Sequence, residues 1–214
     1  MKLDVAEKGV AATLVLTFAQ LLVYFGEELY LRILGGLLFA AGLAVFGAAV
    51  VEMSAVELGL TKKGWKKSIL AGTAIGVALF YAYGFYELLV RGSGLVFETP
   101  FNASVVPLVV AIASSEEFYF RGFLFNALRK KLKMHHSAWF SSLLFALYHQ
   151  NIVGLLISGA PRAPELFLVA FFGGLLLCYA MKKFEGNLLA PISIHVAFDL
   201  MLYTRTSFPS WIFP

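Results

Sequence analysis

The sequence predicts an all-α polytopic membrane protein, a bundle of about seven transmembrane helices. Three observations support this prediction. Of the 214 residues, 60% are hydrophobic and 14% are charged, and the mean hydropathy is +0.81, whereas soluble domains contain about 25% charged residues. The apolar residues gather in blocks that approach the length needed to cross a bilayer. These blocks show no alternation with a period of two residues, which favours helices over a transmembrane barrel.

The apolar blocks follow one another with short polar connections, near residues 10–26, 33–51, 69–90, 105–125, 137–157, 166–181 and 188–203. Each approaches the roughly 20 residues of a spanning helix, and the last two are somewhat short. Little sequence remains for a soluble domain, so we expect one integral membrane domain over residues 1–214. The first block lacks a small-residue cleavage signature, which predicts a retained span rather than a signal peptide.

Positive charge is unevenly distributed over the loops. When alternate loops are assigned to opposite sides, twelve Lys and Arg fall on the side of the N-terminus and four on the other. Because cytoplasmic loops are enriched in Lys and Arg, we predict a cytoplasmic N-terminus and an external C-terminus. Topology then explains the net charge of +4, and we expect the lipid bilayer but no nucleic acid as a partner. The linker near 52–68 mixes apolar residues with four lysines, which predicts an interfacial helix.

Three of the predicted spans carry ionisable groups near their middle. They are Glu116, Glu117 and Arg121 in the fourth block, His149 in the fifth, and His195 and Asp199 in the seventh. Counted from the cytoplasmic charges, Glu116, His149 and His195 each lie 12 or 13 residues deep, which is roughly 18–20 Å of helix. Ionisable residues at membrane depth usually line a site or a pathway, so we expect these groups to share one.

The helical period predicts different roles for the two glutamates. Glu117 and Arg121 are four residues apart and are expected to pair, whereas Glu116 points about 140° away from Arg121 and faces the histidines. A carboxylate and a neutral imidazole that reach one water form a general-base pair, and a second histidine stabilises an oxyanion. Since no serine or cysteine is clearly placed as a nucleophile, the pattern predicts amide hydrolysis by water at membrane depth.

Three short motifs resemble those of the CPBP family, the CAAX prenyl endopeptidase and bacteriocin-processing (Abi) intramembrane proteases. The motifs are "EEFYFRG", "FALYH" and "HVAFD", and the flanking "GNLLAPISIH" and "ELGLTKKGW" also resemble family sequences. The resemblance covers about 105–203, the expected catalytic core. It implies an intramembrane endopeptidase in a prokaryotic cell membrane whose substrate is a membrane-associated peptide or protein, with a prenylated substrate as one form.

The resemblance also implies a role for each residue. Glu116 would be the catalytic glutamate and would act with His149 on the water. His195 and the residue at position 199 would stabilise the oxyanion, and Glu117 and Arg121 would support the site. The third motif commonly ends in Asn, whose amide donates hydrogen bonds, whereas an ionised Asp cannot. Asp199 is therefore either protonated or serves to orient His195.

A metal site is an alternative to the metal-free mechanism. Glu116, His149, His195 and Asp199 would suit zinc as a set of nitrogen and oxygen ligands. The sequence contains no HExxH motif, and we expect a metal-free site without a cofactor.

Two other classes of function use the same polar residues. A proton-coupled membrane carrier would use them as a relay, although the sequence shows no internal repeat of the kind that such carriers contain. A non-catalytic immunity or scaffold protein would keep the motifs and act by association. Loss of function on substitution of Glu116, His149 or His195 would favour the enzyme over the scaffold.

Overall fold

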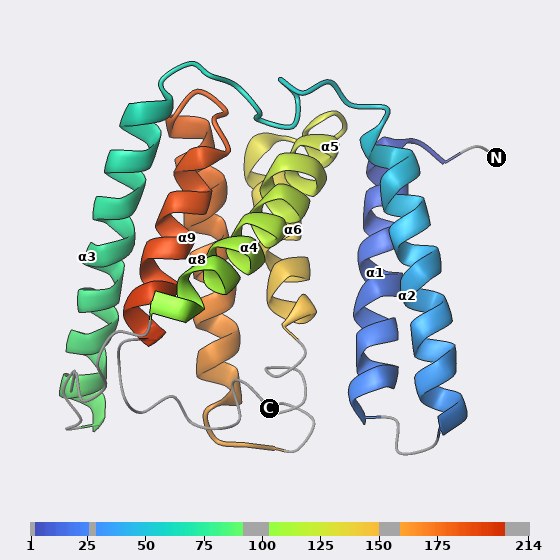
Figure 1. The fold of residues 1–214 in the computed structure, drawn as a ribbon, viewed down its shortest axis with the longest axis horizontal. Helices are drawn as coiled ribbons and strands as arrows, with labels where there is room; N and C mark the ends of the chain where they lie inside the picture. The colour runs from blue at the N-terminus through green and yellow to red at the C-terminus, as the bar shows by residue number, and fades with distance from the viewer. Residues whose placement is uncertain (1–2, 26–28, 92–102, 150–158, 204–214) are drawn as a thin grey trace. The chain divides into compact units, whose positions relative to one another are not determined.

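The computed structural model describes residues 3–25, 29–91, 103–149 and 159–203, and these ranges contain helices and turns but no strand (Figure 1). The predicted all-α class is therefore confirmed. Each of the seven apolar blocks contains a helix. The helices and helical segments are α1 (Val5–Phe25), α2 (Leu29–Val50), α3 (Trp65–Arg91), η1 (Ala103–Val105), α4 (Val106–Glu117), η2 (Phe118–Phe125), α5 (Asn126–Arg129), α6 (Met134–Tyr148), α8 (Ala163–Lys183) and α9 (Leu189–Tyr203).

Four of these helices are long and apolar enough to cross a membrane, judged by length and composition. The segments are Val5–Val23, Ile33–Val50, Trp65–Val90 and Ala163–Lys183. Within the described residues, α9 adds a shorter apolar segment, Leu189–Leu202. A bilayer core requires about 20 apolar residues per spanning helix, and these helices expose many large apolar side chains, among them Leu37, Phe85 and Phe172. The protein is an integral membrane protein.

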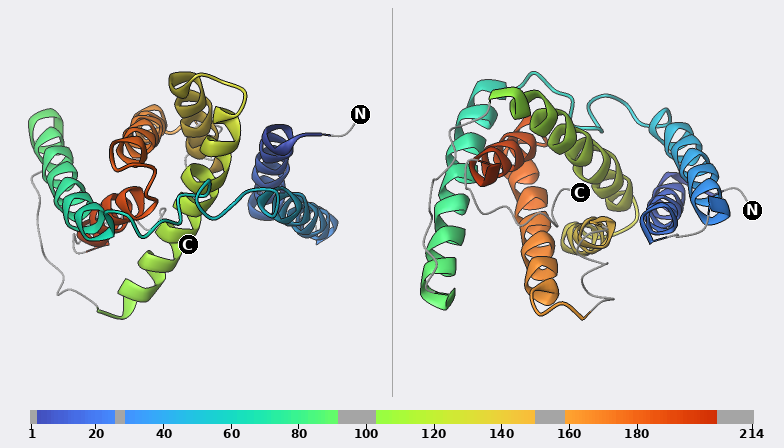
Figure 2. Two further views of the ribbon diagram at one scale, coloured as in Figure 1. Left: turned by 90° about the horizontal axis from the view of Figure 1, so that it is seen from above. Right: turned by 60° about the horizontal axis from the view of Figure 1, so that its bottom comes forward.

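The chain divides into two compact units, and each is described by itself. The first contains Met1–Leu58 and Phe120–Tyr179, and the second contains Gly59–Tyr119 and Ala180–Pro214. In the first unit α1 packs along α2, and in the second α3 packs along α9, as both views of Figure 2 show. Helix α9 also contacts α4 within the second unit.

The interfacial helix predicted near 52–68 does not form as a continuous helix. Residues 51–64 are mainly turns, and α3 begins at Trp65. Two glycines explain the interruption, because Gly59 and Gly64 have φ angles of 76° and 65°, which an α-helix does not allow. A single helical turn ends just before them, closed by the bond from Leu58 N to Ser54 O, 3.0 Å long.

Ion pairs join the loops at the helix ends of the first unit. Lys131 on the loop after α5 contacts Asp4 and Glu7 at the start of α1, and Lys8 pairs with Glu52 after α2. The basic loops that the charge count assigns to one side of the membrane thus meet acidic residues at one end of this unit. The pairs are partly exposed, so each contributes little to stability.

Glu57 provides a pH-dependent contact in the same region. Its carboxylate accepts hydrogen bonds from Lys130 Nζ at 2.8 Å and from the backbone N of Ser54 at 2.7 Å. The bond from Lys130, followed by the bonds from Ser54, lowers the pKa of Glu57 from 4.5 to about 2. A carboxyl group with a depressed pKa stabilises the folded state above pH 4.5, and this contribution is lost as the pH falls toward 2.

We therefore expect Glu57→Gln to lower the thermal unfolding temperature slightly at neutral pH. The difference from the wild type should shrink between pH 4.5 and about 2, because the wild-type carboxyl group becomes protonated there. Unfolding in detergent, followed by circular dichroism at several pH values, measures this difference. A difference that stays constant down to pH 2 would contradict the assigned contact.

Candidate active site

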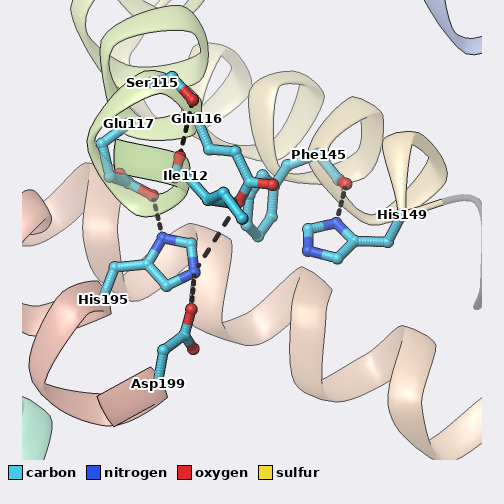
Figure 3. A network of polar contacts seen from close by, with 8 residues as sticks. All are labelled: Ile112, Ser115, Glu116, Glu117, Phe145, His149, His195 and Asp199. Atoms are coloured by element: carbon cyan, nitrogen blue, oxygen red, sulfur yellow. Dashed lines mark hydrogen bonds and ion pairs between the residues drawn. The ribbon is translucent and has the colours of Figure 1, made fainter. Parts of the chain in front are cut away.

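Four of the predicted site residues come together within the second unit. Glu116 and Glu117 end α4, and His195 and Asp199 lie one turn apart on α9 (Figure 3). The imidazole of His195 is at the centre of the group. Its Nδ1 lies 2.8 Å from Glu117 Oε1, and its Nε2 lies 3.9 Å from Glu116 Oε2 and 3.5 Å from Asp199 Oδ2. One ring thus contacts three carboxyl groups.

The carboxyl side chain near Nδ1 of His195 is more deeply buried than the two near Nε2. The side chain of Glu117, on the Nδ1 side, is 0% exposed, whereas those of Glu116 and Asp199, on the Nε2 side, are 18% and 28% exposed. A buried carboxyl group is stable only when polar partners surround it, and His195 is one such partner. The Glu117–His195 contact is the buried anchor of the cluster, and Nε2 faces its more accessible side.

The distances around Nε2 leave room for a reacting oxygen. A separation of 3.9 Å between Nε2 and Glu116 Oε2 is too long for a hydrogen bond. An oxygen atom about 2.8 Å from both atoms fits this separation in a triangular arrangement. A water molecule satisfies that geometry, because it can donate a hydrogen bond to the carboxylate and also bond to Nε2. The arrangement therefore suits chemistry at an oxygen held between a carboxylate and an imidazole.

The contact with Glu117 determines how many protons the Glu117–His195 pair must hold when Nε2 is a donor. For Nε2 to donate a hydrogen bond to an oxyanion, it must carry a proton. The 2.8 Å contact at Nδ1 then needs a second proton, held either by the ring or by Glu117. Oxyanion stabilisation by His195 therefore requires that the Glu117–His195 pair hold two protons. This condition involves Glu117 because its carboxyl group lies 2.8 Å from Nδ1.

His149 belongs to the first unit, where it follows the last residue of α6. Its Nδ1 lies 2.8 Å from the backbone oxygen of Phe145, and its ring lies against the Phe145 ring with centroids 4.5 Å apart. A carbonyl oxygen only accepts hydrogen bonds, so Nδ1 must donate. In the neutral ring Nε2 is then the acceptor, which is the state that a general base needs.

Arg121 is also described within the first unit. The residue is fully buried, and its guanidinium lies 4.0 Å from the centroid of the Phe145 ring. Arg–aromatic contacts of this kind are stronger where water is excluded. Gly174 of α8 lies beside the same guanidinium, because a Cβ at this glycine would meet Arg121 Nη2 at 3.1 Å and Ser142 Cβ at 2.9 Å. Phe145 thus connects the buried arginine to His149.

The helix that carries the glutamates changes its winding directly after them. The α-helix predicted over 105–125 is α-helical only to Glu117, and residues 118–125 form a π-helix. The Asn126 side chain donates to the carbonyls of Arg121 and Gly122 at 3.1 and 3.0 Å, and Ser141 Oγ donates to that of Phe120 at 2.9 Å. The rotation of 100° per residue therefore does not apply beyond Glu117, and the predicted pair of Glu117 with Arg121 stays a prediction.

The contact between Glu117 and His195 was not predicted from the sequence. The helical period assigned Glu117 to Arg121 and directed only Glu116 toward the histidines, whereas both glutamates approach the His195 ring. The sequence signal that could have indicated this contact is that the two glutamates are adjacent, at the end of α4. Ser115, which precedes Glu116, donates its hydroxyl to the carbonyl of Ile112 at 2.8 Å and so makes a local bond.

Zinc binding requires several His, Cys, Asp or Glu side chains around one point. In residues 3–25, 29–91, 103–149 and 159–203, no group of three His, Cys, Asp or Glu side chains is arranged to hold a metal ion. Cys178, the single cysteine of the sequence, is buried.

The family comparison covers the helices that carry the cluster. Residues 98–201 match the family model described as type II CAAX prenyl endopeptidase Rce1-like, and this segment includes Glu116, His149, His195 and Asp199. No match to the chain was found among the curated proteins or among the solved structures. Residues 98–201 of the chain are thus similar to the Rce1-like type II CAAX prenyl endopeptidases, a protease family.

Proposed function

We propose that the protein is an intramembrane endopeptidase that hydrolyses a peptide bond by means of a water molecule activated by Glu116 and His149. The main support is the cluster around His195, because Glu116 and His195 Nε2 lie 3.9 Å apart with the spacing that a reacting oxygen needs. The cluster lies on α4 and on the apolar helix α9, within the segment that matches the protease family.

The proposed reaction begins with proton transfer from water to Glu116. The water oxygen attacks the carbonyl carbon of the peptide, and the electrons of the C=O bond move onto the carbonyl oxygen. His149 Nε2 accepts a hydrogen bond from the second hydrogen of the water, in keeping with the donor role of its Nδ1. The tetrahedral intermediate then collapses, the C–N bond breaks, and Glu116 returns its proton to the leaving amine.

His195 acts in this proposal as the donor to the oxyanion. Its Nε2–H points to the side of the ring where Glu116 and Asp199 lie. Donors that are fixed before the reaction stabilise a developing negative charge strongly. Glu117 holds the ring through Nδ1, and Asp199, if ionised, accepts the Nε2–H between turnovers, since it has no proton to donate. In this proposal Arg121 has a supporting role, because its guanidinium packs against the ring of Phe145 on α6.

The proposed substrate is a membrane-associated peptide or protein. In its narrower form the proposal adds a prenylated substrate, in keeping with the description of the matched family as a CAAX prenyl endopeptidase, and a prokaryotic cell membrane as the location. Two peptides that differ only by the prenyl group test this form. We expect the purified protein in liposomes to cleave the prenylated peptide faster, and equal rates would reject prenyl recognition.

A chelator tests the metal-free mechanism. We expect the rate of peptide cleavage in liposomes to stay within about twofold of its untreated value after incubation with EDTA or 1,10-phenanthroline, because Glu116 and the histidines activate the water in the proposed reaction. Mass spectrometry of the products measures the rate. Activity that disappears with the chelator and returns with added zinc would replace the proposal with a zinc-dependent protease.

The same preparation separates the protease from the other classes of function. His149→Ala should be inactive in cleavage and unchanged in its thermal unfolding. Proton or solute flux across the liposome membrane that is lost in this variant, without cleavage by the wild type, would indicate a carrier. Full biological activity of the variant in cells would indicate a scaffold.

A further inference from the structure

Two glycines of α3 lie directly against the backbone of α9. A Cβ at Gly72 would meet Ala190 O at 2.8 Å, and a Cβ at Gly76 would meet Ile194 O and lie 2.8 Å from Ala197 Cβ. The two glycines are four residues apart and so occupy the same face of α3. Small residues with this spacing allow membrane helices to approach each other closely. Ile194 immediately precedes His195.

The ends of the two helices are also tied together by Asn187. Its Nδ2 donates to the carbonyls of Thr61 and Lys63, at 3.2 and 2.8 Å, in the loop before α3. Its Oδ1 accepts from the backbone N of Leu189 at 2.9 Å and so caps the first turn of α9. The same two loops meet again where Leu188 N donates to Gly59 O at 3.0 Å.

The loop contacts fix where α9 begins, and the glycine contacts fix its distance from α3. A helix that is held at its first turn and two turns further along cannot slide or rotate without breaking one of these contacts. His195 lies within this held part of α9, since a Cβ at Gly76 would meet Ile194 before it and Ala197 after it. The 2.8 Å contact of His195 with Glu117 needs this position of the backbone.

We propose that Gly76, together with Gly72 and Asn187, is a positioning residue of the active site. These residues hold α9 against α3 so that His195 Nδ1 meets Glu117 and Nε2 faces the reacting oxygen. The catalytic part of this inference rests on the proposed function. A side chain at position 76 moves the α9 backbone, because the atom it would meet first is a carbonyl oxygen and not the end of a flexible side chain.

The test compares Gly76→Ala and Gly76→Val with Gly173→Val. Gly173 lies within α8, and a Cβ there meets nothing within 4 Å, so this variant controls for placing a β-branched residue in a membrane helix. We expect Gly76→Val to lower kcat for peptide cleavage by about 100-fold with little change in KM, as misplacement of about 1 Å does. Gly76→Ala should lower kcat less, and Gly173→Val should stay within about twofold of wild type.

A spectroscopic readout keeps the test independent of cleavage. In protein labelled with ¹⁵N-histidine, the His195 signals are identified by their loss in His195→Gln. Gly76→Val should shift these signals, whereas Gly173→Val should leave them unchanged. Asn187→Asp offers a second variant, because it keeps the oxygen that caps α9 and removes the donor to the α3 loop. It should shift the same signals even if Gly76→Val does not fold.

The outcomes separate this inference from the proposed function. Unshifted His195 signals in Gly76→Val and Asn187→Asp, both folded, would overturn the positioning role. If the wild type is an active protease, a kcat equal to the wild-type value in both variants would also overturn the positioning role. A wild type that cleaves no membrane peptide, but whose His195 signals shift in the variants, would instead overturn the proposed function and leave the structural part of the inference supported.

Discussion

Glu116→Gln is expected to lower the rate of peptide cleavage by about 10³-fold, within the range for removal of a general base. The amide of glutamine has nearly the size of the carboxyl group but cannot take a proton from water. The side chain is 18% exposed and lies 3.9 Å from His195 Nε2, so the substitution removes no close hydrogen bond of that ring. The variant should therefore fold like the wild type, which thermal unfolding in detergent checks.

The control for this variant is Glu52→Gln, which makes the same chemical change in an ion pair with Lys8 outside the cluster. It should cleave at the wild-type rate. If Glu116→Gln keeps wild-type turnover in the same liposome assay, Glu116 is not the base, and the assignment of roles in the cluster is wrong.

His195→Asn is expected to remove cleavage while it preserves the fold. The amide nitrogen of asparagine lies near the position of Nδ1 and can still bond to Glu117, but nothing replaces Nε2 beside Glu116 and Asp199. The loss should be about 10²–10³-fold, as expected when one donor to an oxyanion is removed. The turnover in liposomes and the thermal unfolding temperature measure the two effects separately.

His195→Ala provides the comparison, because it removes both contacts of the ring. It should be as inactive as His195→Asn but less stable, since the fully buried Glu117 then loses a hydrogen-bond partner. Equal stability of the two variants would show that the bond to Glu117 contributes little. Cleavage by His195→Asn at the wild-type rate would exclude Nε2 from the reaction.

The helical class could be predicted from composition because the bilayer restricts the possible structures. Apolar blocks near the length of a span, without alternation, form helices in lipid, and each predicted block contains one. The π-helix at 118–125 could not be predicted, since its hydrogen-bonding pattern depends on Asn126 and on Ser141 of another helix. The turns at 51–64 were not predicted because the mix of apolar and basic residues favoured an interfacial helix. The positive φ angles of Gly59 and Gly64 interrupt that helix.

The site could be predicted in part because depth along a helix follows from residue counting. Glu116 and His195 were expected at one level, and their side chains lie 3.9 Å apart. The prediction for Glu117 missed its contact with His195. The reason is that tertiary packing decides which faces of α4 and α9 meet, and the helical period alone does not give this. The sequence did contain a signal for that packing, the segment "GTAIG" from Gly72 to Gly76, whose spacing is typical of closely packed membrane helices.

The most direct test of the central claim is a comparison of membrane peptides from cells that produce the wild type or Glu116→Gln at equal levels. The claim is that this protein hydrolyses a peptide bond in a membrane-associated substrate and that Glu116 activates the water. It predicts at least one membrane peptide that is shortened in wild-type cells and intact in the variant, identified by mass spectrometry of new termini. Identical sets of termini in the two samples, with both proteins folded in the membrane, would contradict it.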